Sequence, residues 1–520
     1  MSQEAKQEFG KWRSFFWPVH AFELKKLLPM FFMFFFISFN YTILRDTKDT
    51  LIVTAAGAEA IPFLKSFGVV PAAIIFMLIY AKLSNVLSKE NLFYVTLVPF
   101  IVFFGLFAFV MYPAREALMP TDASVSVLRE YLPAGWHGLA AACQNWMYSL
   151  FYILAELWGS VALSLLFWGF ANQITRVTEA KRFYSLFGLG ANLALLVSGP
   201  AIVYVSGIRK HLAAGIDPWQ VSLNYLMGMV VVAGIAVLAI YWWMHRNVLT
   251  DVRFYDPNQE RAPGKKKKAK MSLTDSFRFI FTSKYILSLA VLVIAYGISI
   301  NLVEVTWKSQ VKLQYPNYND YSTFMGWFST FTGAVTIFMM LFVGGNLIRR
   351  KGWGFAAMIT PIVLLITGVA FFSFVMFRDS LEGQISKIGM IFPFIQQWMN
   401  PLFLAVIFGA AQNIMSKSSK YSLFDPTKEM AYIPLDDDSK VKGKAAVDVV
   451  GARLGKSGGS AIQIGLLAFG TLATITPYIG AILLVIIAAW LLAVRSLNKQ
   501  FLNLTADQAK AADGEKITVS

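Results

Sequence analysis

Cysteine and histidine are both scarce in this sequence. The single cysteine, Cys143, cannot form an intramolecular disulfide, so a disulfide-stapled fold is excluded and the redox compartment cannot be read from cysteine usage. The four histidines (His20, His137, His211 and His245) show no metal-ligand spacing, and no Ser/His/Asp set falls in one plausible pocket. We therefore predict no metal site, no cofactor and no catalytic residues.

The fraction of charged residues is also low, and the fraction of apolar residues is correspondingly high. Charged residues make up 15% of the chain, where about 25% is ordinary, and apolar residues make up 57%, where about 45–50% is ordinary. Abundant large hydrophobes exclude a disordered chain, and a soluble chain this apolar would have too little polar material to cover its surface. The composition predicts a polytopic membrane protein.

Twelve apolar stretches are long enough to cross a bilayer as helices, which takes roughly 20 residues each. They are too long and continuous to be the strands of a β-barrel, so we predict an all-α protein. The predicted spans are 28–47, 65–86, 91–112, 142–171, 184–206, 221–244, 284–306, 324–348, 354–377, 390–416, 446–472 and 475–495.

A basic run at 261–270 (RAPGKKKKAK) separates the first six spans from the last six. The positive-inside rule makes this linker cytoplasmic, and an even number of spans then places both termini in the cytoplasm as well. The first apolar run is too long for a cleavable signal, which favours a bacterial inner-membrane protein. The predicted organisation is a tail (1–27), a six-helix bundle (28–245), the linker (246–283), a second bundle (284–496) and a second tail (497–520).

The net charge of +16 follows largely from this topology. The basic residues are spread over short loops, and no folded basic domain is present, so we predict no nucleic-acid partner. The expected surroundings are a lipid bilayer, and we expect a monomer.

An internal repeat relates the two halves. The chain reads FWGFANQITRVTEAKRFYSLFG (167–188) after the fourth span and IFGAAQNIMSKSSKYSLFD (407–425) after the tenth. Two parallel six-helix halves related by an axis along the membrane normal are the architecture of major-facilitator transporters, with the substrate near mid-membrane between the halves. We therefore predict a major-facilitator-like fold of two pseudo-symmetric halves, although the loop between spans two and three lacks the signature of many facilitators.

Four ionisable residues stand out because a charge at a helix centre costs roughly 2.5–3.5 kcal/mol to insert. Lys48 follows span one, Glu156 lies in the middle of span four, Glu304 in span seven and Lys456 in span eleven. Such side chains should point to partners or to a wet cavity. They could form structural ion pairs instead of a binding site. Lys48, near a predicted helix end, could simply be neutralised by neighbouring aspartates.

The run GARLGKS (451–457) resembles a phosphate-binding Walker loop without matching it. Three residues, not four, separate Gly451 from the Gly-Lys pair, and no strand precedes the run. We therefore predict that the protein is not an enzyme, and a membrane-embedded enzyme that uses ATP stays an alternative supported by this run alone. Its small residues and Lys456 would suit a phosphate, but Gly455, Gly458 and Gly459 would equally permit close helix packing.

Several long motifs carry a resemblance to a known family. NYTILRDTKDTL, AELWGSVALSLLFWGFANQIT, AYGISINLVEVTWK, KYSLFDPTKEMAYIPLD and VKGKAAVDVVGARLGKSGG are similar to segments of the ATP/ADP translocases of chlamydiae, rickettsiae and plant plastids. The resemblance covers roughly residues 20–505 and is strongest to the chlamydial type. The charged positions important in that family fall on Lys48, Glu156, Glu304 and Lys456.

The resemblance implies import of ATP in exchange for ADP, with phosphate as a further transported substrate. We expect Lys48 and Lys456 to hold the phosphates, and Glu156 and Glu304 to pair with these cations when the site is empty. Lesser candidates are Asn301, for the base or a phosphate, and three further cations for the phosphates: Arg45, Lys308 and Lys417. A proton-driven or broader nucleoside-triphosphate transporter is the alternative, because relatives with other specificities share these motifs.

Overall fold

The structure is a computed structural model that describes residues 19–251, 254–255, 280–281, 283–382 and 400–518. Within these ranges every regular element is a helix. The side chains of some helical residues, among them Lys456, lie outside the described part. Most of the predicted linker and the start of the predicted tenth span also lie outside it.

The first half begins with η1 (Ala21–Glu23) and α3 (Leu24–Ala56), a helix of 33 residues. The second span is composite, because a π-helical turn joins two α-helical pieces. The fourth span is also composite. The remaining elements of this half are α4 (Ala60–Phe63), η2 (Leu64–Val69), α5 (Val70–Ser84), α6 (Lys89–Leu106), η3 (Phe107–Met111), α10 (Trp146–Trp158), η5 (Gly159–Phe167), α11 (Trp168–Ile174), α12 (Val177–Gly207), η6 (Ile208–His211) and α13 (Pro218–Asn247).

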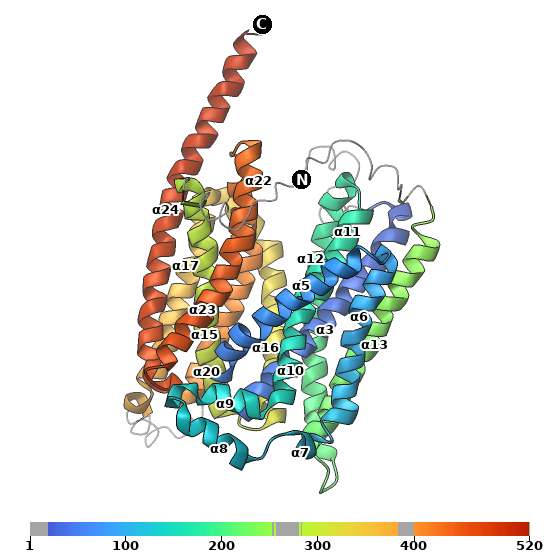
Figure 1. Ribbon diagram of the computed structural model, residues 1–520. Helices are drawn as coiled ribbons and strands as arrows, with labels where there is room; N and C mark the ends of the chain where they lie inside the picture. The colour runs from blue at the N-terminus through green and yellow to red at the C-terminus, as the bar shows by residue number, and fades with distance from the viewer. Residues whose placement is uncertain (1–18, 252–253, 256–279, 282, 383–399, 519–520) are drawn as a thin grey trace.

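The second half begins with α15 (Lys284–Gln314), the partner of α3 in the predicted symmetry. Its last helix, α24 (Leu472–Thr518), projects well beyond the bundle (Figure 1). The elements between them are α16 (Tyr318–Phe338), η8 (Met339–Gly344), α17 (Gly345–Met376), α20 (Pro401–Ser419), η9 (Lys420–Phe424), α21 (Asp425–Ala431), α22 (Asp437–Ala445), η10 (Ala446–Gly451) and α23 (Ala452–Leu467).

Nine helical stretches of the described chain are long and apolar enough to span a bilayer, so the count of twelve is not confirmed. One of them, Tyr318–Met376, holds the predicted eighth and ninth spans, and the backbone leaves helical geometry between them at Gly352 (φ 82°). The predicted eleventh span is helical but is not among these nine stretches. Beyond the predicted last span (475–495), α24 continues as a helix to Thr518, through a run rich in the helix formers Ala, Lys and Gln.

Four short helical segments that the sequence did not predict connect α6 to α10. They are α7 (Arg115–Leu118), α8 (Asp122–Tyr131), η4 (Ala134–Trp136) and α9 (His137–Gln144), and they cross beneath both groups of helices at the lower end of Figure 1. A Cβ on Gly135 would collide with the backbone oxygens of Leu467 and Gly470, which follow from the other half. This connection therefore joins the two halves at that end.

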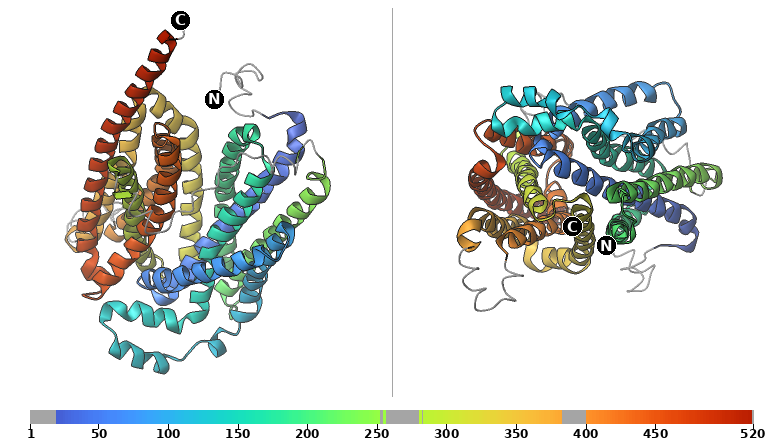
Figure 2. Two further views of the ribbon diagram at one scale, coloured as in Figure 1. Left: turned by 45° about the horizontal axis from the view of Figure 1, so that its top comes forward. Right: turned by 90° about the horizontal axis from the view of Figure 1, so that it is seen from below.

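The two halves meet most extensively where α12 packs against α16. Glycines allow this close approach, because a Cβ on Gly199 would lie 2.6 Å from the carbonyl oxygen of Gly326. On the other side of the molecule, α4 and η2 contact α23. The helices of the two halves lie close together at the lower end of Figure 1 and diverge toward the upper end, an arrangement that Figure 2 shows from two other directions. The start of α3 and the far end of α24 both lie at the upper end.

Candidate functional site

A polar segment lies in the last third of α3, within an otherwise apolar helix. Every side chain from Asp46 to Thr50 is buried. The expectation that Lys48 lies near a helix end is wrong, because α3 continues to Ala56 without a break. A charge buried this deeply needs partners, and the surrounding helices supply them.

Lys48 lies between two carboxylates. Its Nζ is 2.8 Å from Asp49 Oδ1 and 2.9 Å from Glu156 Oε1, and it stands 4.0 Å from the centroid of the Tyr152 ring. Glu156 comes from α10, which packs against α3. The predicted pairing of Lys48 with Glu156 is therefore present, together with a second acid.

Asp49 extends the network into the other half. Its second oxygen, Oδ2, lies 2.8 Å from Lys308 Nζ, and Lys308 in turn lies 2.9 Å from Glu304 Oε1, one helical turn earlier on α15. Asp49 and Lys308 are each only 1% exposed. An ion pair thus joins the first helix of one half to the first helix of the other, deep inside the protein.

Lys65 is part of this network, although the sequence did not predict it. It comes from η2, and its Nζ lies 2.7 Å from Asn301 Oδ1 and 3.3 Å from Glu304 Oε2. The predicted second span began at residue 65, where a lysine is ordinary because span ends are rich in cations. The helical stretch in fact begins at Ala60, which places Lys65 inside it. The apolar run Ala60–Leu64 was the signal that could have found it.

Two further cations lie beside the network. Arg45 Nε is 3.0 Å from Asp46 Oδ1, and Arg45 Nη2 donates to the hydroxyl of Ser329 on α16, so this pair also reaches the other half. Lys417, on α20, lies 4.9 Å from the centroid of the Phe328 ring and forms no ion pair with a carboxylate of the described chain.

The backbone of Lys456 lies in α23, but its side chain is outside the described residues. The glycines around it are explained by helix packing: a Cβ on Gly455 would lie 3.1 Å from the backbone of Gly297, and a Cβ on Gly459 would lie 2.6 Å from Asn301 Cβ. The close packing of α23 on α15 brings the helix that carries Lys456 to Asn301.

The central tryptophans are structural. Trp158 and Trp307 are fully buried, and their indole N–H groups donate to the backbone oxygens of Ile37 and Val406. Their hydrogen bonds stabilise packing between helices of the same half. Neither ring is free to stack on a base in this arrangement.

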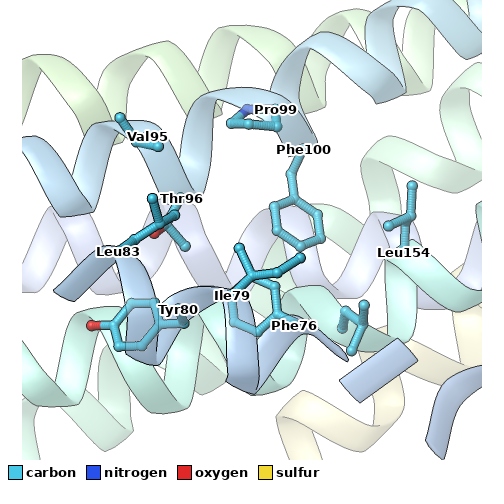
Figure 3. A pocket seen from close by; sticks show the side chains of 10 residues that line it. Phe76, Ile79, Tyr80, Leu83, Val95, Thr96, Pro99, Phe100 and Leu154 are labelled. Atoms are coloured by element: carbon cyan, nitrogen blue, oxygen red, sulfur yellow. The ribbon is translucent and has the colours of Figure 1, made fainter. Parts of the chain in front are cut away.

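An apolar pocket lies elsewhere, between α5 and α6 (Figure 3). Its volume is about 270 Å³, and no charged side chain lines it. A polyanion needs positive charge and hydrogen-bond donors, so this pocket cannot be the place where phosphates bind. Its lining residues are Phe76, Ile79, Tyr80, Leu83, Val95, Thr96, Pro99, Phe100, Leu154 and Leu157.

The charged side chains described above lie where the two halves meet, a region we call the seam. Among the described side chains there, bases exceed acids by one. The acids are Asp46, Asp49, Glu156 and Glu304, and the bases are Arg45, Lys48, Lys65, Lys308 and Lys417. A base that is paired with a carboxylate can exchange that carboxylate for another anion at little electrostatic cost. The arrangement is suited to a small molecule with several negative charges.

The comparison with known proteins agrees with this chemistry. Residues 2–501 match the family model described as TLC ATP/ADP transporter. The chain belongs to this family. It is 58% identical to ADP,ATP carrier protein 1 of Chlamydia muridarum, over 97% of this chain and 94% of that one. It is 54% identical to the chloroplastic ADP,ATP carrier protein 1 of Arabidopsis thaliana (96% of this chain, 77% of that one) and 46% identical to ADP,ATP carrier protein 1 of Rickettsia bellii (94% and 96%).

The fold of this family member is similar to that of solved major-facilitator-type transporters. A bacterial homologue of ferroportin aligns with a TM-score of 0.54 at 13% identity, over 93% of this chain and 100% of that one. The D-xylose–proton symporter aligns with a TM-score of 0.54 at 10% identity, over 92% and 97%. These likenesses show the fold alone and confirm that it is all-helical and major-facilitator-like, as the sequence predicted.

Proposed function

We propose that this protein exchanges ATP for ADP across the bacterial inner membrane, with both termini in the cytoplasm, and that it does so as a monomer. The observation that carries the proposal is the set of bases at the seam: among the described side chains four bases are paired with four acids, and Lys417 is a fifth base. The names of the relatives, ADP,ATP carrier proteins, support the same substrates. The family and its relatives are transporters and not enzymes.

Nucleotide binding starts from Lys417, which forms no ion pair with a carboxylate of the described residues. It attracts a phosphate first, because none of these carboxylates must be displaced from it. Arg45, Lys48, Lys308 and Lys456 then contribute as phosphate oxygens replace carboxylates. Glu156 and Glu304 take the cations back when the nucleotide leaves. Asn301 offers an amide to the base or to a phosphate.

The two bundles, 28–245 and 284–496, move against each other about this site, with the linker 246–283 between them. Ion pairs that cross the seam, such as Asp49–Lys308, form in the empty site and hold the halves together. Arg209, in η6, and Asp320, in α16, form another pair across the seam. A nucleotide that replaces the central pairs lowers the cost of separating the halves, which couples binding to movement.

The membrane potential gives a reason for a third transported species. ATP carries about four negative charges and ADP about three, so one-for-one import moves a net negative charge inward, which costs about 2.3 kcal/mol per 100 mV against an inside-negative potential. Phosphate that leaves together with ADP relieves this cost. We therefore include phosphate among the substrates.

The test is uptake of labelled ATP by liposomes that contain the purified protein. Liposomes loaded with ADP should take up ATP, and liposomes without internal nucleotide should not. Uptake into empty liposomes that depends on a proton gradient would instead favour a proton-driven nucleoside-triphosphate transporter. Adding phosphate to internal ADP should raise the rate under an inside-negative potential if phosphate leaves with ADP.

A further inference from the structure

Lys65 is held in the site by an unusual piece of backbone. The π-helical turn η2 spans Leu64–Val69, and the N–H of Val70 donates to the carbonyl oxygen of Lys65, five residues earlier. Single π-helical turns inside α-helices occur often at functional sites. Gly68 lets this turn pack closely on α10, since a Cβ there would lie 2.7 Å from Ile153 Cδ1. The backbone that carries Lys65 is therefore fixed against the helix that carries Glu156.

The three lysines of the network differ in how firmly they are held. Lys48 and Lys308 each have two carboxylate partners at 2.8–2.9 Å, and their side chains are 3% and 1% exposed. Lys65 has one carboxylate at 3.3 Å and a neutral amide at 2.7 Å, and its side chain is 22% exposed. Of the three, Lys65 is the most accessible and the least neutralised.

Moving Lys65 leaves little unpaired behind it. Glu304 keeps its contact with Lys308 at 2.9 Å, and the amide nitrogen of Asn301 keeps its hydrogen bond to Gly297. Moving Lys48, by contrast, would take from Glu156 the one cation that pairs with it in the described chain. An anion that enters the site can therefore recruit Lys65 more easily than it can recruit Lys48.

We propose that Lys65 is a further phosphate-binding residue of this transporter. When a nucleotide enters the site, the Lys65 side chain moves away from Asn301 and Glu304 and binds a phosphate of the nucleotide. This inference rests on the proposed exchange of ATP and ADP at the same site. Lys65 belongs to the first half and both of its partners to the second, so its transfer to the nucleotide also removes a contact across the seam.

Binding of labelled ATP to purified protein, with inorganic tripolyphosphate as competitor, tests the proposal. Lys65→Gln should raise the apparent Kd for ATP about tenfold and weaken tripolyphosphate competition by a similar factor, because it loses a charge-assisted hydrogen bond. Lys65→Arg should keep most of the affinity. Lys82→Gln, the same change at an exposed lysine near the end of α5, is the matched control and should bind both ligands as the unmodified protein does.

A chemical rescue separates phosphate binding from a structural role. Lys65→Cys is made in a protein whose exposed Cys143 is replaced by serine, and it is then treated with aminoethyl or sulfonatoethyl methanethiosulfonate. The aminoethyl adduct returns a terminal ammonium and should restore ATP binding, whereas the negatively charged sulfonatoethyl adduct should not. ATP present during labelling should slow both reactions. The rescue also decides the matter if Lys65→Gln does not fold.

Two results would overturn the role of Lys65: unchanged affinity for ATP and tripolyphosphate in Lys65→Gln, or no difference between the two adducts. Either result leaves ATP/ADP exchange by the unmodified protein intact. Absence of exchange in the unmodified protein would instead contradict the proposed function itself, so the two failures are distinguishable.

Discussion

Replacing Asp49 with asparagine removes a carboxylate that lies between two lysines of opposite halves. Asp49 is 1% exposed, and its two oxygens each lie 2.8 Å from a lysine nitrogen, on Lys48 and on Lys308. Removing one partner of a buried ion pair destabilises a protein by about 3–5 kcal/mol, because the other charge stays buried without compensation. Both lysines keep a second acid, Glu156 or Glu304, so the lower value applies.

We expect Asp49→Asn to lower the free energy of unfolding by about 3 kcal/mol, which is roughly a hundredfold in the folding equilibrium. The matched control is Asp320→Asn, which removes the same charge from another pair across the seam. Asp320 and its partner Arg209 are 33% and 30% exposed, and a pair so accessible to solvent contributes less than about 1 kcal/mol.

Unfolding of both variants by SDS in mixed micelles, followed by tryptophan fluorescence, measures these free energies. Their difference should be about 2 kcal/mol or more. Equal losses in the two variants, or a stable Asp49→Asn protein, would show that the central network does not join the halves energetically.

Three further changes test the site and the seam. Lys417→Gln should weaken ATP binding about tenfold without lowering the free energy of unfolding, because no described carboxylate loses a partner; a less stable protein with normal affinity would count against its role. Glu156→Gln and Lys456→Ala should each reduce ATP/ADP exchange in liposomes at least about tenfold, and normal exchange by both would refute the site assignment. Gly135→Ala should slow exchange while ATP binding is retained, because the added Cβ collides with the backbone oxygens of Leu467 and Gly470; a normal exchange rate would show that this contact plays no part in transport.

The energetics of membrane insertion decide which features of this protein the sequence alone predicts. Long apolar runs predict spanning helices wherever they occur, and a charge inside such a run predicts a partner without naming it. Glu156 and Glu304 were recognised in this way, and both lie in the network. Lys48 was recognised too, although its helix was predicted to end where it in fact continues. Helix ends depend on contacts with other helices as well as on local hydropathy.

The ion-pair partners of Asp49 and Lys65 could not be predicted from the sequence alone. Asp49 was treated as a local neutraliser of Lys48, yet its other oxygen binds Lys308, more than 250 residues away in sequence. Lys65 lies at the start of the predicted second span and drew no prediction, and only the π-helical turn and the packing of α4 and η2 on α23 bring it to Glu304. The sequence by itself determines that a charge inside an apolar span must be neutralised, because the bilayer imposes this requirement on every buried charge alike. The tertiary structure decides which partner each charge has, because this depends on how the helices of the two halves meet.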